Sequence, residues 1–192
     1  MTTKISELLD AAAREAAPVV RGVGDDQLGE RTPCADYTVR DLLNHLFHVV
    51  INFQALAARK DADFTTTPDY LSGDWRGRFA DETARLVEAW AVPGADEGVS
   101  GAMNLPARTV GSLALVDLTV HAWDLARATG QDFTADAASV QALGALMDEM
   151  GPTARQMKVF GEPFPVPDEA SAIDTLLAAT GRDPRWSPAH RL

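Results

Sequence analysis

The sequence predicts an all-α protein, built as a four-helix bundle with a helical C-terminal extension. Apolar residues recur every three or four positions through most of the chain, and no run shows the clear period-two alternation of a strand. Segments rich in glycine and proline separate four main helical stretches, which bury their apolar faces most simply against one another. At 192 residues, the chain is long enough for one good-sized core. We therefore expect a single domain over residues 1–192.

The first two helices are expected at residues 5–20 and from Thr38 to near Lys60, separated by the turn-rich stretch GVGDDQLGERTPCADY. Asp41 stands three residues after Thr38. This is the spacing of a capping box, in which the two side chains satisfy each other's free backbone N–H groups. The pattern therefore assigns Asp41 to the start of the second helix.

A third helix is expected at about residues 74–91, and a fourth within residues 112–130, where Gly130 stops it. The glycine- and proline-rich segment 92–111 between them is expected to be a loop with room for a short hairpin. Two shorter helices are expected near residues 135–150 and 168–179. They are separated by GEPFPVPD, whose three prolines exclude helix. Three tryptophans at helical positions are expected in the core: Trp75, Trp90 and Trp123.

The composition argues against nucleic acid and membranes as binding partners. The net charge of −11, from 28 acidic and 17 basic residues, opposes nonspecific binding to nucleic acid or anionic lipid. No apolar run reaches the roughly 18 residues of a membrane span, and the N-terminus lacks the apolar core of a signal peptide. The single cysteine, Cys34, permits no intrachain disulfide. We expect a cytoplasmic protein that acts on a small molecule, without nucleic acid or membrane partners, and the sequence leaves a homodimer open.

The fourth helix carries three groups that are costly in an apolar environment. Asp117, His121 and Asp124 lie at positions i, i+4 and i+7 of SLALVDLTVHAWDLARATG, and therefore on one helix face. A buried carboxylate costs several kcal/mol unless it is paired or bound to a metal. No lysine lies in this helix, so the compensating charge must come from elsewhere. A divalent cation is the economical candidate.

The second helix offers the remaining ligand. A bundle readily brings side chains of facing helices to one internal site, and His45 would join Asp117 and His121 as two imidazoles and one carboxylate. Three protein ligands leave positions open, as in a reactive metal site. The predicted metal ligands are therefore His45, Asp117 and His121.

Other assignments stay open at this point. Asp117 and His121 could form a hydrogen-bonded pair without a metal. Asp124 could replace Asp117 as a ligand, although we favour its orienting the other ring nitrogen of His121. We favour a role other than ligand for His48. Cys34 is expected to pack rather than to ligate, since His45 lies roughly 10 Å along the helix from its start.

The motifs TPCADYTVRDLLNHL and VDLTVHAWDLARATGQ resemble the metal-binding domain of mycothiol-dependent maleylpyruvate isomerase, within the DinB-like four-helix superfamily. The closing DTLLAATGRDPRW is similar to small stand-alone members. The resemblance implies a DinB-like bundle and a divalent metal, commonly zinc or nickel. The metal would be held by His45, Asp117 and His121. The isomerase usually carries glutamate at the position of Asp117 and has a further C-terminal domain for which this chain is too short.

The leading functional hypothesis is a thiol-dependent transferase or isomerase, in which mycothiol binds the metal and attacks a small electrophile. General acid or base roles would fall to His48 or Asp124, the nearest candidates. Two alternatives remain: metal-assisted hydrolysis, and a non-catalytic metal-binding or stress-response bundle. Two histidines and a carboxylate also suit non-haem iron oxygenases, which we discount because those typically have another fold.

Overall fold

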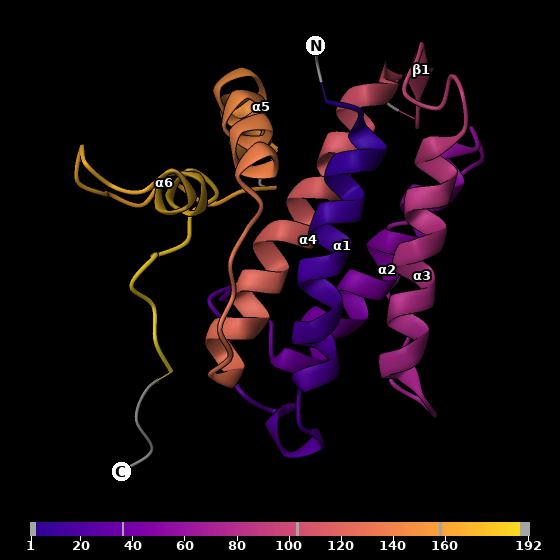
Figure 1. The fold of residues 1–192 in the computed structure, drawn as a ribbon. Coiled ribbons are helices and arrows are strands. Elements are labelled where there is room, and N and C mark those ends of the chain that lie inside the picture. The colour runs from indigo at the N-terminus through magenta and orange to yellow at the C-terminus, as the bar shows by residue number, and fades with distance from the viewer. Residues whose placement is uncertain (1–2, 36, 103, 158, 189–192) are drawn as a thin grey trace.

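The computed structural model describes residues 3–35, 37–102, 104–157 and 159–188 and is almost entirely helical (Figure 1). Two-residue strands β1 (Val99–Ser100) and β2 (Leu105–Pro106) pair antiparallel. The predicted all-α fold and the short hairpin are confirmed. The remaining described elements are α1 (Ile5–Gly22), the 3₁₀ turn η1 (Asp25–Gln27), α2 (Val39–Ala57), α3 (Trp75–Ala91), α4 (Ala107–Thr129), α5 (Ala137–Gln156) and α6 (Ala172–Ala179).

Helices α1 to α4 form the bundle, in which α1 and α2 each pack against both α3 and α4. Helix α5 packs on α4 and α1, and α6 packs on α5, to one side of the bundle (Figure 1). The core contains the three tryptophans as predicted, each no more than 7% exposed. Within the described residues, no helix is long and apolar enough to cross a membrane. The largest fully buried side chains include Ile5, Leu9, Leu42, Leu43, Leu46, Phe47, Phe79, Leu86, Leu115, Leu118, Leu125 and Leu143.

The start of α2 is fixed by the predicted capping box. The backbone N–H of Asp41 donates to Thr38 Oγ1 at 3.3 Å, and the backbone N–H of Thr38 donates to Asp41 Oδ2 at 3.0 Å. The carboxylate of Asp41 is therefore engaged at the helix terminus, and its predicted capping role is confirmed. Helix α2 ends at Ala57, earlier than expected, and Arg59 follows with a positive φ of 57°.

Three other helix ends differ from the prediction. Helix α4 begins at Ala107 and follows directly from β2, with Pro106 at its N-cap. Helix α5 continues past Met150 to Gln156, with Pro152 in its last turns. Helix α6 begins only at Ala172, where the Ser171 hydroxyl accepts a bond from the backbone N–H of Asp174. The face that α4 presents to the bundle is unaffected by these shifts.

Close packing holds α4 against α1 and α3 at Gly111. A Cβ atom at this position would lie 2.7 Å from Cγ1 of Ile5 and 3.2 Å from the ring of Trp90. Both neighbours are buried. Glycine therefore sets how closely the helix that carries Asp117 and His121 can approach the bundle.

We predict that Gly111→Ala lowers the free energy of unfolding by about 1–3 kcal/mol, because the added methyl group overpacks the α1–α3–α4 contact. Gly144→Ala is the matched control, because a Cβ there meets nothing within 4 Å. It should instead raise helix stability by up to about 1 kcal/mol. Urea unfolding followed by circular dichroism measures both. Equal effects of the two substitutions would contradict the packing described for Gly111.

Candidate metal centre

The facing sides of α2 and α4 bring the three predicted ligands together. Oδ1 of Asp117 lies 3.7 Å from Nε2 of His45 and 3.5 Å from Nε2 of His121. The two imidazole rings meet edge to face, with centroids 5.0 Å apart. All three ligand atoms lie within 4.8 Å of one another. The predicted set is thus one cluster, with one ligand from α2 and two from α4.

The spacing of these atoms fits a shared cation. Two metal–ligand bonds of about 2.1 Å that meet at a tetrahedral angle hold their ligand atoms about 3.4 Å apart. The two nitrogen–oxygen distances of 3.5 and 3.7 Å are close to that value. They are also longer than an ordinary N–H···O hydrogen bond. The donor set of two imidazoles and a carboxylate suits zinc, nickel or another divalent transition metal.

Asp124 fixes the orientation of His121, as the sequence analysis favoured. Its Oδ2 atom lies 2.9 Å from Nδ1 of His121, and its side chain is completely buried. An ionised carboxylate can only accept, so Nδ1 carries the proton and donates it to Asp124. In the neutral imidazole, which is the form that binds a metal, Nε2 then has the free lone pair, and it is the nitrogen that faces Asp117. A carboxylate behind a histidine in this way is the usual support of a metal ligand.

Burial and charge act against each other in the cluster. Burial opposes ionisation of Asp117, but the neighbouring imidazoles of His121 and His45 outweigh burial and hold the pKa of Asp117 well below its usual range. Burial also opposes a charged His121, yet the carboxylates of Asp117 and Asp124 outweigh burial and raise the pKa of His121 above its ordinary value. The side chains of His45 and Asp117 are each 24% exposed, whereas that of His121 is 9% exposed. The cluster is therefore open to solvent on the side of His45 and Asp117.

Arg182, which sequence reasoning missed, supplies a positive charge beside Asp124. Its Nη2 donates to Asp124 Oδ2 at 3.2 Å, and its side chain is only 11% exposed. Burial opposes the charged guanidinium, but the charge of Asp124 and its hydrogen bond outweigh burial and raise the pKa of Arg182. The positive charge that compensates Asp124 is thus that of an arginine outside the helix. Asp117 instead faces the two histidines.

The C-terminal segment delivers Arg182 through a tight turn after α6. Gly181 has a φ of 84°, and a Cβ there would lie 2.9 Å from the backbone of Gly161. This position therefore favours glycine. Arg127 on α4 donates through Nη2 to the backbone carbonyl of Trp186 at 2.8 Å, which ties the segment to the bundle. The motif GRDPRW thus contains the residues that attach the extension beside the metal centre.

Cys34 lies closer to the cluster than the sequence predicted. Its ligand atom lies within 4.8 Å of ligand atoms of His121 and Asp124. The estimate of roughly 10 Å followed only the axis of α2, whereas the chain before this helix folds back. Thr32 Oγ1 donates to the carbonyls of Cys34 and Tyr37 at 2.9 Å each, and the Tyr37 N–H donates to Cys34. Cys34 is half-buried beside the site, and it is not among the three residues of the cluster that contains His45.

A second triad of Cys34, His121 and Asp124 is less suited to a cation. A cation bound by Asp124 there would compete with the hydrogen bond between Nδ1 of His121 and Oδ2 of Asp124. This triad would also place the cation beside the guanidinium of Arg182. Both the lost hydrogen bond and the like-charge repulsion oppose a metal there. The geometry therefore favours the triad that contains His45.

His48 lies outside the cluster, and His190 lies outside the described residues. Nδ1 of His48 is 3.2 Å from the hydroxyl of Tyr70, and both of its ring nitrogens are 3.3 Å from Nδ2 of Asn52. Asn52 in turn donates to the carbonyl of Asp63. These contacts fix the loop after α2. They place His48 in a separate polar group, consistent with the preference for a role other than ligand.

Residues 9–126 match the mycothiol maleylpyruvate isomerase N-terminal domain. The chain belongs to this family. The match spans α1 to α4 and includes all three clustered residues, and it identifies the bundle as a DinB-like helical domain. It also indicates a metal-binding function related to mycothiol.

Similar full-length proteins occur in two strains of Mycobacterium tuberculosis, where each is named an uncharacterized protein. Each is 34% identical over 176 residues, which cover 88% of this chain and 92% of the relative. The similarity therefore extends well beyond the matched domain. No solved structure matches the chain.

We predict that Arg182→Met lowers the free energy of unfolding by about 3–5 kcal/mol, because Asp124 is left as a buried charge without its cation. Arg185→Met is the matched control. Its side chain is 83% exposed and pairs with Asp183, so the expected loss is within about 1 kcal/mol. Thermal or urea unfolding of the metal-free proteins measures both.

A double variant tests the cause of this loss. Asp124→Asn removes the charge that Arg182→Met strands, so the combined loss should be smaller than the sum of the two single losses. Strict additivity would show that Arg182 and Asp124 do not act as a pair.

Proposed function

We propose that His45, Asp117 and His121 bind one divalent metal ion, with zinc and nickel as the leading candidates. The observation that carries the proposal is the hydrogen bond from His121 to Asp124, because it directs the free Nε2 lone pair of His121 toward Asp117 and His45. The ligand spacing and the family support the same assignment.

We further propose that the protein is a thiol-dependent transferase or isomerase that uses mycothiol on small electrophiles. A bound divalent cation would lower the pKa of a coordinated thiol and hold it as the nucleophilic thiolate. The chain itself supplies the binding geometry. Asp124 keeps His121 in one tautomer, Asp117 contributes negative charge, and the exposed edge of His45 and Asp117 leaves a path for the thiol.

The experiments below distinguish this proposal from two other functions. Hydrolysis would place water where the thiol is proposed, and it would proceed without any thiol. A non-catalytic metal-binding protein would hold the ion without forming product. The family favours the thiol reaction over both, because its description includes mycothiol.

Metal content tests the ligands. Protein purified without chelator or a nickel column should contain about one divalent ion per chain, and His121→Ala should lose most of it, since one of three ligands is gone. Asp41→Ala is a sharp control because Asp41 and His45 have the same four-residue spacing as Asp117 and His121. It should cost about 1 kcal/mol of stability through the lost cap and keep the metal. Equal metal in wild type and His121→Ala would refute the assignment.

Cobalt substitution tests the thiol chemistry. Adding mycothiol to the cobalt-loaded protein should produce a sulfur-to-cobalt charge-transfer band in the near ultraviolet, because the thiolate becomes a ligand. With 1-chloro-2,4-dinitrobenzene as electrophile, mass spectrometry should detect the mycothiol adduct at a rate that His121→Ala abolishes. Product formed from water alone would favour hydrolysis. If neither the charge-transfer band nor any product is detected, the result would favour a non-catalytic metal-binding protein.

A further inference from the structure

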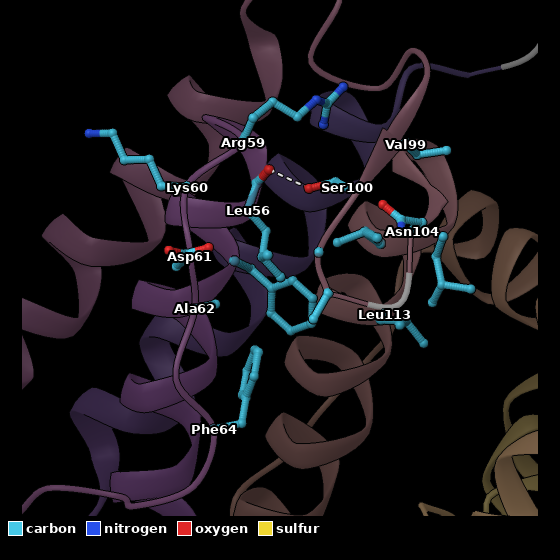
Figure 2. Close-up of a pocket in the computed structure, with 15 residues that line it drawn as sticks. Leu56, Arg59, Lys60, Asp61, Ala62, Phe64, Val99, Ser100, Asn104 and Leu113 are labelled. Carbon is cyan, nitrogen blue, oxygen red and sulfur yellow. Dashed lines mark hydrogen bonds between the residues drawn. The ribbon is translucent and has the colours of Figure 1, made fainter.

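A cavity of about 540 Å³ lies between α2, α4, the β1–β2 hairpin and the loop that follows α2. This volume lies within the range of roughly 300–1,000 Å³ typical of small-molecule pockets. Figure 2 shows the side chains of Leu56 and Phe64 pointing toward one another across it. Its apolar lining includes Phe53, Leu56, Phe64, Val99, Val110 and Leu113.

Two of the apolar residues that line the cavity are unusually exposed. Phe64 is 50% exposed and Val99 is 53% exposed, although both are large hydrophobic residues. A single exposed apolar side chain is ordinary, but two around one apolar cavity indicate a place where a ligand is bound. The ring of Phe64 also lies 5.8 Å from the ring of Phe53, at the buried side of the cavity.

Three of the polar residues that line the cavity are already bonded or directed elsewhere. The hydroxyl of Ser100 donates to the carbonyl of Leu56 at 2.7 Å. The guanidinium of Arg59 donates to the carbonyls of Gly94 and Glu97. Lys60 extends away from the cavity (Figure 2). This lining favours an uncharged apolar group over an anion.

The cavity lies on the same helix faces as the candidate metal centre. Leu56 follows His45 by eleven residues on α2, and Val110 precedes Asp117 by seven on α4, so each pair lies within roughly 20° of one face. Along α4, Leu113 and Val110 lie roughly 6 and 10 Å from Asp117.

A cavity residue also contacts the turn of α2 that follows His45. The ring of Phe64 is 6.0 Å from that of His48, one turn from His45. Along α4, a molecule would have to span roughly 6–10 Å to reach from Asp117 to the cavity residues Leu113 and Val110, which is within the length of a small amphipathic molecule.

We propose that this cavity binds the apolar alkyl or aryl end of the substrate while its polar, reactive end lies at the metal centre. The substrate class is thus an amphipathic small electrophile with an uncharged apolar tail. This inference rests on the metal centre of the proposed function, but it does not depend on the thiol reaction.

Straight-chain hydroxamic acids test the proposal without catalysis, because their head group is a metal ligand and their tail length can be varied. The cobalt-loaded protein is titrated with aceto-, butyro-, hexano- and octanohydroxamic acid, and binding is followed by the cobalt visible spectrum. If the tail enters the cavity, each added methylene group should raise the affinity about 4-fold until the cavity is filled.

Two variants test whether the alkyl tail binds in this cavity. Leu113→Trp fills the cavity, and Phe64→Ala removes one of its walls; neither side chain is fully buried, so both variants should fold. Both should flatten the dependence on chain length and leave the affinity for acetohydroxamic acid unchanged. Val92→Ala is the control, since Val92 is 59% exposed and lies outside the cavity lining. It should retain the wild-type dependence.

The outcomes separate this inference from the function proposed above. Affinity independent of chain length, or a dependence that both cavity variants retain, overturns the inference while the metal centre stands. If acetohydroxamic acid leaves the cobalt spectrum unchanged, the bound metal has no free coordination position. The proposed metal centre and this inference are then both wrong. A chain-length dependence that the variants abolish supports the inference even if no mycothiol adduct forms, and in that case only the thiol chemistry is wrong.

Discussion

The hydrogen bond between His121 and Asp124 is the constraint on which the candidate site depends. Without it, the imidazole could rotate or change tautomer, and Nε2 would have no fixed direction. With it, Nε2 faces Asp117 and the α2 histidine. Two partners at Oδ2, the imidazole and the guanidinium of Arg182, offset part of the cost of burying Asp124 completely. Helix α4, which is otherwise apolar, can therefore bury the polar side chains of His121 and Asp124.

The extension beyond the bundle is part of this arrangement. Arg182 reaches Asp124 only because α6 ends in a tight glycine turn and the bond from Arg127 to Trp186 ties the following segment to α4. The orientation of a ligand on α4 thus depends on a segment outside the matched family domain. The side chains of His45 and Asp117 remain partly exposed, and the apolar cavity is lined by other residues of α2 and α4. The residues that orient His121 therefore lie on one side of the site, and the solvent-exposed side chains lie on the other.

Helical periodicity was sufficient to predict the bundle, because each main helix carries a continuous apolar face. The spacing of Asp117, His121 and Asp124 on one helix likewise required only the helical repeat. The proximity of His45 could be proposed, but the repeat does not give the register between α2 and α4. Contacts made by loops could not be predicted, because no periodicity governs them. This explains why Arg182 was missed and why the fold-back that brings Cys34 to the site was overlooked.

The central claim is that one cation is shared by Nε2 of His45, Nε2 of His121 and a carboxylate oxygen of Asp117. The most direct measurement is a crystal structure of the zinc-loaded protein, with diffraction data collected on both sides of the zinc absorption edge. The account predicts an anomalous peak at about 2.0–2.2 Å from those three atoms, with an open coordination position toward solvent. A peak bound to Nδ1 of His121 with Cys34 and Asp124, or no peak between α2 and α4, would contradict it.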